Sequence, residues 1–170
     1  QEIEEAVECV RATGNEQVVL LKCVSAYPAP PEEMNLRTIL DLQERFVCPV
    51  GLSDHTLGHE AALAAVSLGA RVIEKHFILS RKDGGPDASF SMEPEEFANM
   101  AKSIRMVESV LGTVSYEPTA RESVNQQFRR SLFVVEDVRE GESFTRENIR
   151  SIRPAAGIPP KHYEEILGRE

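Results

Sequence analysis

The stretch "GLSDHTLGHEAALAAVSLGARVIEKHF" covers residues 51–77 and decides the fold, because two apolar segments in it each end in charged groups and one histidine. Residues 48–55 and 71–79 have the apolar character of short strands. The alanine-rich segment 56–70 between them predicts a helix that ends near Gly69. Either the two strands deliver ligands to one site, or their polar residues are ordinary strand ends.

The flanking sequence continues the alternation of strand and helix. The apolar run "VVLLKCVSAYP" at 18–28 predicts a strand buried on both faces, and 29–46 predicts a loop followed by a helix. Further helices are predicted at 1–13 and 92–112, with a loop rich in glycine and proline at 80–91. This order is typical of an α/β fold with a parallel sheet. Three strands cannot close a barrel, so we expect a fragment, or a sheet that other residues complete.

The character of the sequence changes after Gly112, the predicted end of a first domain at 1–112. The segment "TVSYEPTARESVNQQF" at 113–128 is polar, carries no apolar stripe and predicts a linker. Residues 129–170 begin with a predicted strand at Ser131–Val135. About 40 residues without a disulfide or metal are few for an independent domain, so we expect this segment to lack its end.

Composition narrows the class of protein. Of 170 residues, 41% are hydrophobic and 28% charged, which is typical of a soluble globular protein. A net charge of −9 and the lack of a basic patch argue against nucleic acid as a partner. No apolar run is long enough to cross a membrane. The three cysteines form no C-x-x-C pair, which fits a cytoplasmic protein and argues against both a disulfide framework and a zinc knuckle.

The two strand ends place four polar side chains on equivalent faces. Because side chains alternate along a strand, Ser53 and His55 share one face, and Glu74 and His76 share the equivalent face of the next strand. Neighbouring parallel strands would bring both histidines to one edge, where barrel enzymes keep their active sites. Two imidazoles with carboxylates nearby suit a divalent transition metal. The alternative is that each histidine only forms a hydrogen bond at its strand end.

Other candidates follow from the same alternation. Ser25 and Tyr27 share one face of the first strand. Lys22 and Lys75 fall on the helix-facing side, where we expect their ammonium groups to reach solvent. Asp87, in the loop "DGGPDASF", could reach a substrate, although a solvated turn aspartate is the simpler interpretation.

Four segments together resemble one known family. "KCVSAYPAP", "GLSDHTLGHEAALAAVSLGARVIEKHF", "GGPDASFSMEPEEF" and "RRSLFVVEDVREGESF…RPAAGIPP" occur in this order in the sialic acid synthase family. The resemblance implies a (β/α)8 TIM barrel followed by a small antifreeze-like (SAF) domain. The chain would supply the last three strands of the barrel, the linker and part of the SAF domain at 129–170. The catalytic glutamate and the phosphate-binding lysines of the family would lie in the missing early barrel, so the fragment alone should be inactive.

The resemblance also implies a metal and a phosphoenolpyruvate site. His55 and His76 correspond to the two histidine ligands of a divalent metal, usually Mn²⁺, with Mg²⁺ or Co²⁺ as alternatives. Ser53 corresponds to a serine that contacts phosphoenolpyruvate. Ser25 lies in a segment that approaches the same ligand, although the family often has asparagine there.

The sugar site is implied by four further residues. Tyr27 corresponds to a residue that lines the sugar pocket. Glu74 and Asp87 match acidic residues near the acceptor sugar and are the catalytic candidates. Arg153 matches an SAF-domain arginine that reaches across a domain-swapped homodimer to the N-acetyl group of the sugar bound by the partner.

The implied reaction is the metal-dependent condensation of phosphoenolpyruvate with an N-acetylated hexose, which yields a nine-carbon nonulosonic acid and phosphate. The "GGPDASFS" loop and the "RPxxGIPPK" tail are most similar to the pseudaminic acid synthase branch, whose acceptor is an N-acetylated 6-deoxy hexose. Synthases of legionaminic or N-acetylneuraminic acid are the close alternatives. A non-catalytic carbohydrate-binding protein is the alternative from another class.

Overall fold

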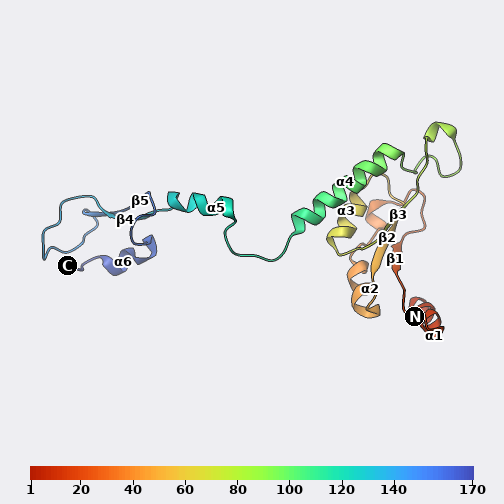
Figure 1. The fold of residues 1–170 in the computed structure, drawn as a ribbon, viewed down its shortest axis with the longest axis horizontal. Helices are drawn as coiled ribbons and strands as arrows, with labels where there is room; N and C mark the ends of the chain where they lie inside the picture. Colours follow the sequence, from red (N-terminus) through yellow and green to blue (C-terminus); the bar gives the residue numbers. More distant parts are fainter. The chain divides into compact units, whose positions relative to one another are not determined.

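The computed structural model describes residues 1–170, which divide into two compact units, Gln1–Thr113 and Val114–Glu170. The first unit alternates strands with helices along the chain (Figure 1). Its elements are α1 Glu2–Ala12, β1 Leu20–Cys23, η1 Pro31–Glu33, α2 Thr38–Phe46, β2 Val50–Asp54, α3 Glu60–Ser67, β3 Ile73–Lys75, η2 Arg81–Asp83 and α4 Pro94–Leu111.

The strands of the first unit form one parallel sheet in the order β1-β2-β3. The register pairs Cys23 with Ser53, Ser53 with Glu74, and Asp54 with Lys75. The strands are shorter than predicted: β1 has four residues and β3 has three. Apolar character extends beyond the backbone pairing, because Val24 and Ala26 still pack on the core after β1 has ended.

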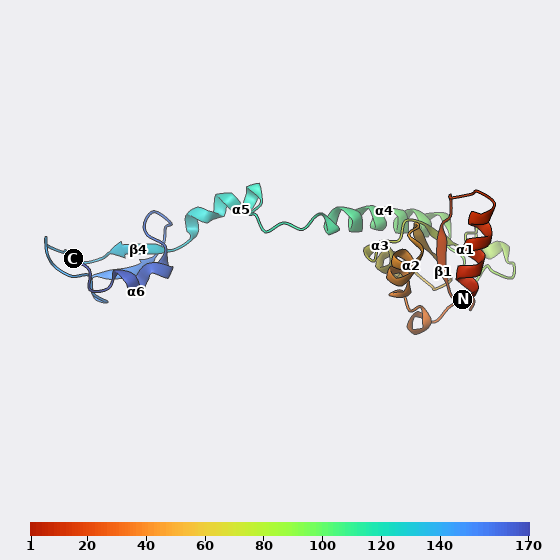
Figure 2. The same ribbon diagram turned by 90° about the horizontal axis from the view of Figure 1, so that it is seen from below.

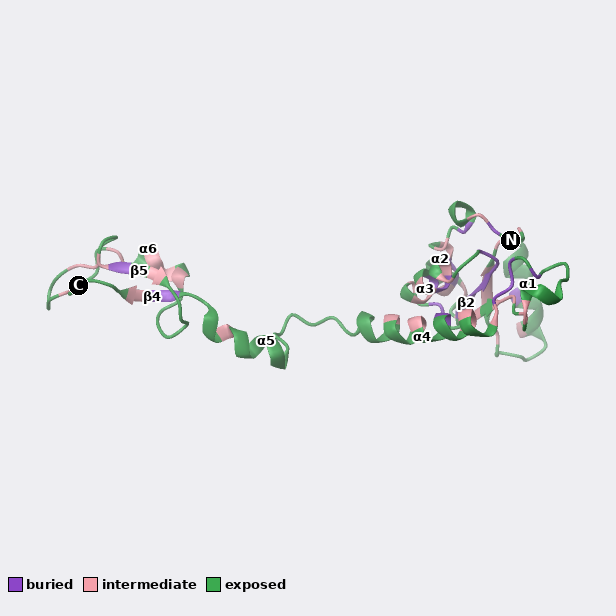
Figure 3. Ribbon diagram, turned by 90° about the horizontal axis from the view of Figure 1, so that it is seen from above, coloured by how far each residue is buried: buried purple, intermediate pink, exposed green.

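The core lies on the face of the sheet that α2 and α3 cover, and α4 lies alongside α3 (Figures 1 and 2). Val50 and Leu52 of β2 are fully buried there against Ile39 and Leu42 of α2. Every residue of β2 is buried, as the colouring in Figure 3 shows. The central strand therefore carries the core on one face and offers the other face to a site.

The loop from β3 to α4 is tied to the start of α4. Glu93 and Glu96 form a reciprocal capping box, and Pro94 occupies the first turn, where its missing N–H costs nothing. Arg81 donates both NH1 and NH2 to Glu96, at 2.5 and 2.7 Å, and its backbone N–H donates to Glu93. The loop that carries Asp87 is thereby anchored at both ends.

The second unit contains a two-stranded antiparallel sheet, in which β4 pairs with β5. Its elements are α5 Ala120–Asn125, η3 Gln126–Phe128, β4 Ser131–Val134, β5 Ile149–Ile152, η4 Pro160–His162 and α6 Tyr163–Ile166. The hydroxyl of buried Ser131 accepts hydrogen bonds from the backbone of Ala156 and Gly157 and donates to the carbonyl of Pro154.

Two elements of the second unit were not predicted. Helix α5 lies within the predicted linker and begins with a capping box between Thr119 and Glu122. The polar composition of the segment predicted a linker, and one capping box is too local a signal to change that prediction. Strand β5 is only four residues long and alternates poorly in the sequence. None of the helices in the structure has both the length and the apolar character that a membrane span requires.

A substitution in the core should distinguish buried from exposed apolar positions of α2. Ile39 is fully buried, whereas its neighbour Leu40 is 45% exposed. We expect Ile39→Ala to lower the free energy of unfolding by about 2–5 kcal/mol, because it removes buried methyl groups and leaves a cavity. Leu40→Ala is the matched control and should cost much less. Urea denaturation of both variants of the full-length protein measures this, and equal losses would contradict the core assignment.

Candidate functional site

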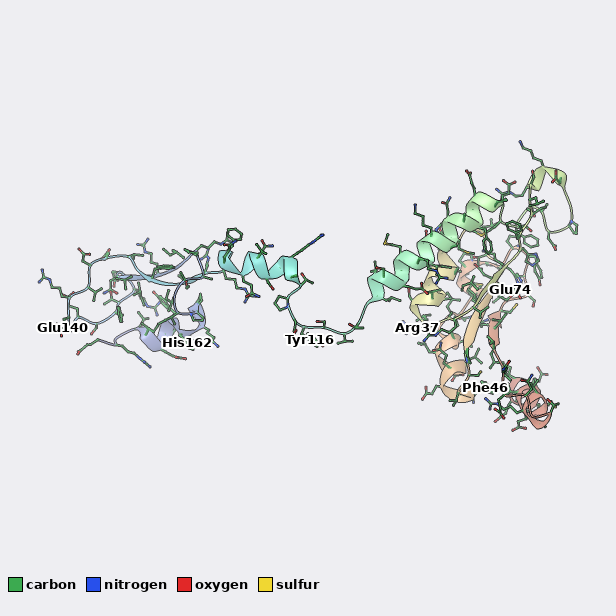
Figure 4. The ribbon with its side chains drawn as sticks, viewed as in Figure 1. Arg37, Phe46, Glu74, Tyr116, Glu140 and His162 are labelled. Carbon is green, nitrogen blue, oxygen red and sulfur yellow. The ribbon has the colours of Figure 1, made fainter.

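The C-terminal ends of β2 and β3 place Ser53 and Glu74 side by side. The two residues are register partners, and the Ser53 hydroxyl donates to Glu74 Oε1 at 2.7 Å. Ser53 is buried, whereas Glu74 is exposed on β3, where Figure 4 labels its side chain. The structure therefore brings together two of the residues that side-chain alternation placed on one face.

His55 and His76 follow these two residues and also meet. Their ring centroids are 5.2 Å apart, with the ring planes at 69°. His55 Nδ1 lies 2.8 Å from the carbonyl oxygen of Val24. Because a carbonyl can only accept, Nδ1 carries a proton, and in the neutral ring Nε2 is then the nitrogen whose lone pair can bind a metal.

Aromatic rings surround the two imidazoles. The Tyr27 ring lies 4.4 Å from that of His55 and 5.7 Å from that of His76, centroid to centroid. Phe90 packs edge-on against His76 at 4.9 Å and lies 5.5 Å from Tyr27. Sequence reasoning singled out Tyr27 but missed Phe90, whose only signal was its place in the loop that also carries Asp87.

Asp87 also lies beside His76. Its Oδ2 is 3.5 Å from His76 Nδ1, and its side chain is 56% exposed. The backbone N–H and the hydroxyl of Ser91 both donate to the carbonyl of Asp87, which fixes the turn that presents the carboxylate. The loop thus places one carboxylate beside the candidate metal ligands, as an orienting partner of the imidazole or as a contact for substrate.

The donor set at these strand ends is incomplete for a metal ion. In residues 1–170, no group of three or more His, Cys, Asp and Glu side chains could hold a metal ion by itself. Two neighbouring imidazoles, one held in the ligand tautomer, nevertheless fit two positions of a borderline transition metal. The remaining positions would be filled by water, substrate or residues outside this chain.

Lys75 differs from its expected position. We expected its ammonium group to reach solvent, but the side chain is only 1% exposed and donates to Asp54 Oδ2 at 2.7 Å. It also donates to the carbonyl of Thr56 at 2.7 Å. The expectation for Lys75 was wrong because the register places a buried carboxylate directly opposite it. Lys22, by contrast, is partly exposed and donates to the carbonyl of Cys23.

Two predicted site residues are not joined to this group. Ser25 is exposed and lies two residues after the end of β1. Its side chain forms no hydrogen bond in the structure. Arg153 is exposed and belongs to the second unit, just after β5. Their roles in binding substrate remain predictions.

The comparisons with known proteins assign the chain to a family. Residues 1–116 match the model of the NeuB family, and residues 129–170 match that of the SAF domain. The chain is 42% identical to a pseudaminic acid synthase of Campylobacter jejuni over 170 residues, which cover 100% of this chain and 50% of that protein. An N,N'-diacetyllegionaminic acid synthase of the same species is 40% identical, over 99% of this chain and 51% of its own length.

A solved structure supports the same assignment. An N-acetylneuraminic acid (sialic acid) synthetase from Leptospira borgpetersenii, crystallised with citrate, is 37% identical with a TM-score of 0.66. The alignment covers 73% of this chain and 43% of that one. The chain therefore belongs to the NeuB family of sialic acid synthases and carries an SAF domain, which confirms the predicted fold class. It spans about half the length of the curated relatives it matches.

The anchor of the Asp87 loop should respond to acid. The hydrogen bonds from Arg81 lower the pKa of Glu96 from 4.5 to about 2. A carboxylate with a lowered folded-state pKa stabilises the fold above its unfolded pKa, and this contribution is lost as the pH falls through the folded value. We therefore expect Arg81→Gln to reduce stability slightly at pH 6, because so exposed a pair is screened by solvent, and by progressively less toward pH 2.

The pH profile of urea unfolding for wild type and Arg81→Gln provides the measurement. Arg105→Gln, which breaks an exposed ion pair with Glu108 on α4, is the matched control. A difference between wild type and Arg81→Gln that stayed constant from pH 6 to pH 3 would contradict the assigned coupling.

Proposed function

We propose that the chain forms part of a nonulosonic acid synthase, which condenses phosphoenolpyruvate with an N-acetylated hexose and releases phosphate. Membership of the NeuB family supports this proposal. The observation that carries it is the imidazole pair of His55 and His76, which meet at the ends of adjacent parallel strands beside Ser53 and Glu74. Barrel enzymes assemble their active sites at this end of the strands.

His55 and His76 would hold a divalent metal, for which Mn²⁺ is our first choice, with Mg²⁺ or Co²⁺ as alternatives. When bound, such an ion supplies a Lewis acid that polarises the aldehyde carbonyl of the open-chain sugar. The chain's own contribution is to engage Nδ1 of His55 with the carbonyl of Val24, which leaves Nε2 as the nitrogen that would bind the ion. The rings of Tyr27 and Phe90 pack against the imidazoles and would hold their orientation.

Ser53 and Glu74 couple the two substrate sites in this proposal. A serine hydroxyl has one proton to donate, and in this structure Ser53 donates it to Glu74. Binding of phosphoenolpyruvate to Ser53 would redirect that proton to the anionic ligand. Glu74 would accept a hydrogen bond from a hydroxyl of the acceptor sugar. Asp87 and Tyr27 are the other sugar contacts, and the catalytic residues in this proposal are Glu74 and Asp87.

The particular product we propose is pseudaminic acid, made from an N-acetylated 6-deoxy hexose. The 42% identity to a pseudaminic acid synthase supports this choice. The N,N'-diacetyllegionaminic acid synthase is 40% identical, so legionaminic acid is the second candidate product. We also propose that the enzyme acts in the cytoplasm as a domain-swapped homodimer, in which Arg153 contacts the N-acetyl group of the sugar bound by the partner.

An acceptor assay decides among the sugars. We expect the full-length protein to release phosphate from phosphoenolpyruvate with Mn²⁺ and the N-acetylated 6-deoxy hexose that leads to pseudaminic acid. Turnover of only the sugar that leads to legionaminic acid would support the second candidate, and turnover of only N-acetylmannosamine would contradict both. Binding of sugar without phosphate release from any acceptor would favour a non-catalytic carbohydrate-binding protein.

Replacement of single histidines tests the metal ligands. His55→Ala and His76→Ala should each lower Mn²⁺-dependent phosphate release by at least about 100-fold, because each removes a direct ligand whose loss exceeds the 10–100-fold cost of losing an outer-shell partner. His162→Ala is the matched control, because His162 lies in the second unit and pairs with Glu165. It should retain wild-type activity. Full activity of either site variant would refute the metal assignment.

A further inference from the structure

A buried charged cluster lies directly behind the candidate metal ligands, on the helix-facing side of the sheet. Asp54 and Lys75 are the last register partners of β2 and β3, and their side chains are 0% and 1% exposed. Each residue immediately precedes one of the two histidines in the chain. The cluster faces away from the substrate side, so it cannot contact the reacting groups.

The cluster fixes the backbone directly after His55. Asp54 Oδ1 accepts from the backbone N–H of Thr56 at 2.9 Å and from its hydroxyl at 2.8 Å. Lys75 donates to Asp54 Oδ2 and to the carbonyl of Thr56, both at 2.7 Å. The main chain of Thr56, which follows His55, is therefore attached to β3 by a side chain that lies one residue before His76.

The backbone ladder cannot provide this link. The register of β2 and β3 ends at Asp54 and Lys75, and no strand pairing joins His55 to His76. The carbonyl of His55 instead accepts from Ala29, and that of His76 accepts from Met92. Beyond the last paired residues, the two histidines are held by different segments. On the helix-facing side, the bonds from Lys75 to Asp54 and Thr56 join their strands.

We propose that Asp54, Lys75 and Thr56 form a positioning cluster that sets the distance and direction between the His55 and His76 imidazoles. This inference rests on the metal site of the proposed function. A buried ion pair is a poor source of stability, because the desolvation of both charges offsets their attraction. Such a pair is better suited than an apolar contact to hold two ligands in a fixed direction. Metal sites depend on such outer residues to orient their ligands.

Binding of Mn²⁺ alone to the full-length protein tests the cluster, with the electron paramagnetic resonance signal of free Mn²⁺ as the readout. Asp54→Leu/Lys75→Met replaces the pair with apolar side chains and leaves no unpaired buried charge. We expect it to fold, as judged by circular dichroism, and to bind Mn²⁺ about 10–100-fold more weakly than wild type. Asp54→Asn keeps the shape of the side chain and tests the same proposal if the double variant does not fold. We expect this single variant to bind Mn²⁺ about 10-fold more weakly than wild type.

A stability control separates positioning from general damage. Ile39→Ala loses core packing, but Ile39 takes no part in the hydrogen bonds of the cluster. Its affinity for Mn²⁺ should therefore stay within about twofold of wild type, while the cluster variants lose more. The visible absorption of bound Co²⁺ should also change shape in the cluster variants and not in Ile39→Ala, because it reports the geometry of the ligands.

The possible failures are distinguishable. Folded cluster variants that bind Mn²⁺ as tightly as wild type would overturn the positioning role and leave the proposed function intact. An equal loss of affinity in Ile39→Ala would also overturn it. A wild-type protein whose Mn²⁺ binding is absent, or is unchanged by His55→Ala, would overturn the metal site itself, and the positioning role with it.

Discussion

The parallel pairing of β2 with β3 is the constraint on which the rest of the first unit depends. Its register places Ser53 opposite Glu74 and Asp54 opposite Lys75. A slip by one residue would turn every side chain of a strand to the other face. The same register therefore decides which polar groups reach the substrate side and which are buried against the helices.

Each face of this strand pair has its own chemistry. On one face Val50 and Leu52 complete an apolar core, which ends in the buried Asp54–Lys75 pair. On the other face the hydrogen bond between Ser53 and Glu74 leads to two imidazoles under aromatic cover. The site is thus supported from behind by the most buried part of the unit, which suits a site whose ligands must hold a fixed geometry.

Side-chain alternation predicted the faces of the strands, because a period of two depends only on the backbone. It could not predict the contacts, because these depend on register and on distant loops. Lys75 was expected in solvent and is buried, since its register partner is a carboxylate. Phe90 lies at the site because of the path of its loop, which the periodicity of the sequence does not predict. The only sequence signal for α5 was one local capping box.

The central claim is that His55 and His76 bind one divalent ion through their Nε2 atoms. A crystal structure of the full-length protein soaked with Mn²⁺, with anomalous diffraction measured on both sides of the manganese absorption edge, tests this claim most directly. The account predicts one manganese peak within about 2.0–2.3 Å of Nε2 of both histidines, near the metal–imidazole distances found in proteins. A manganese peak at another group of ligands, or imidazoles that remain unbound at saturating Mn²⁺, would contradict it.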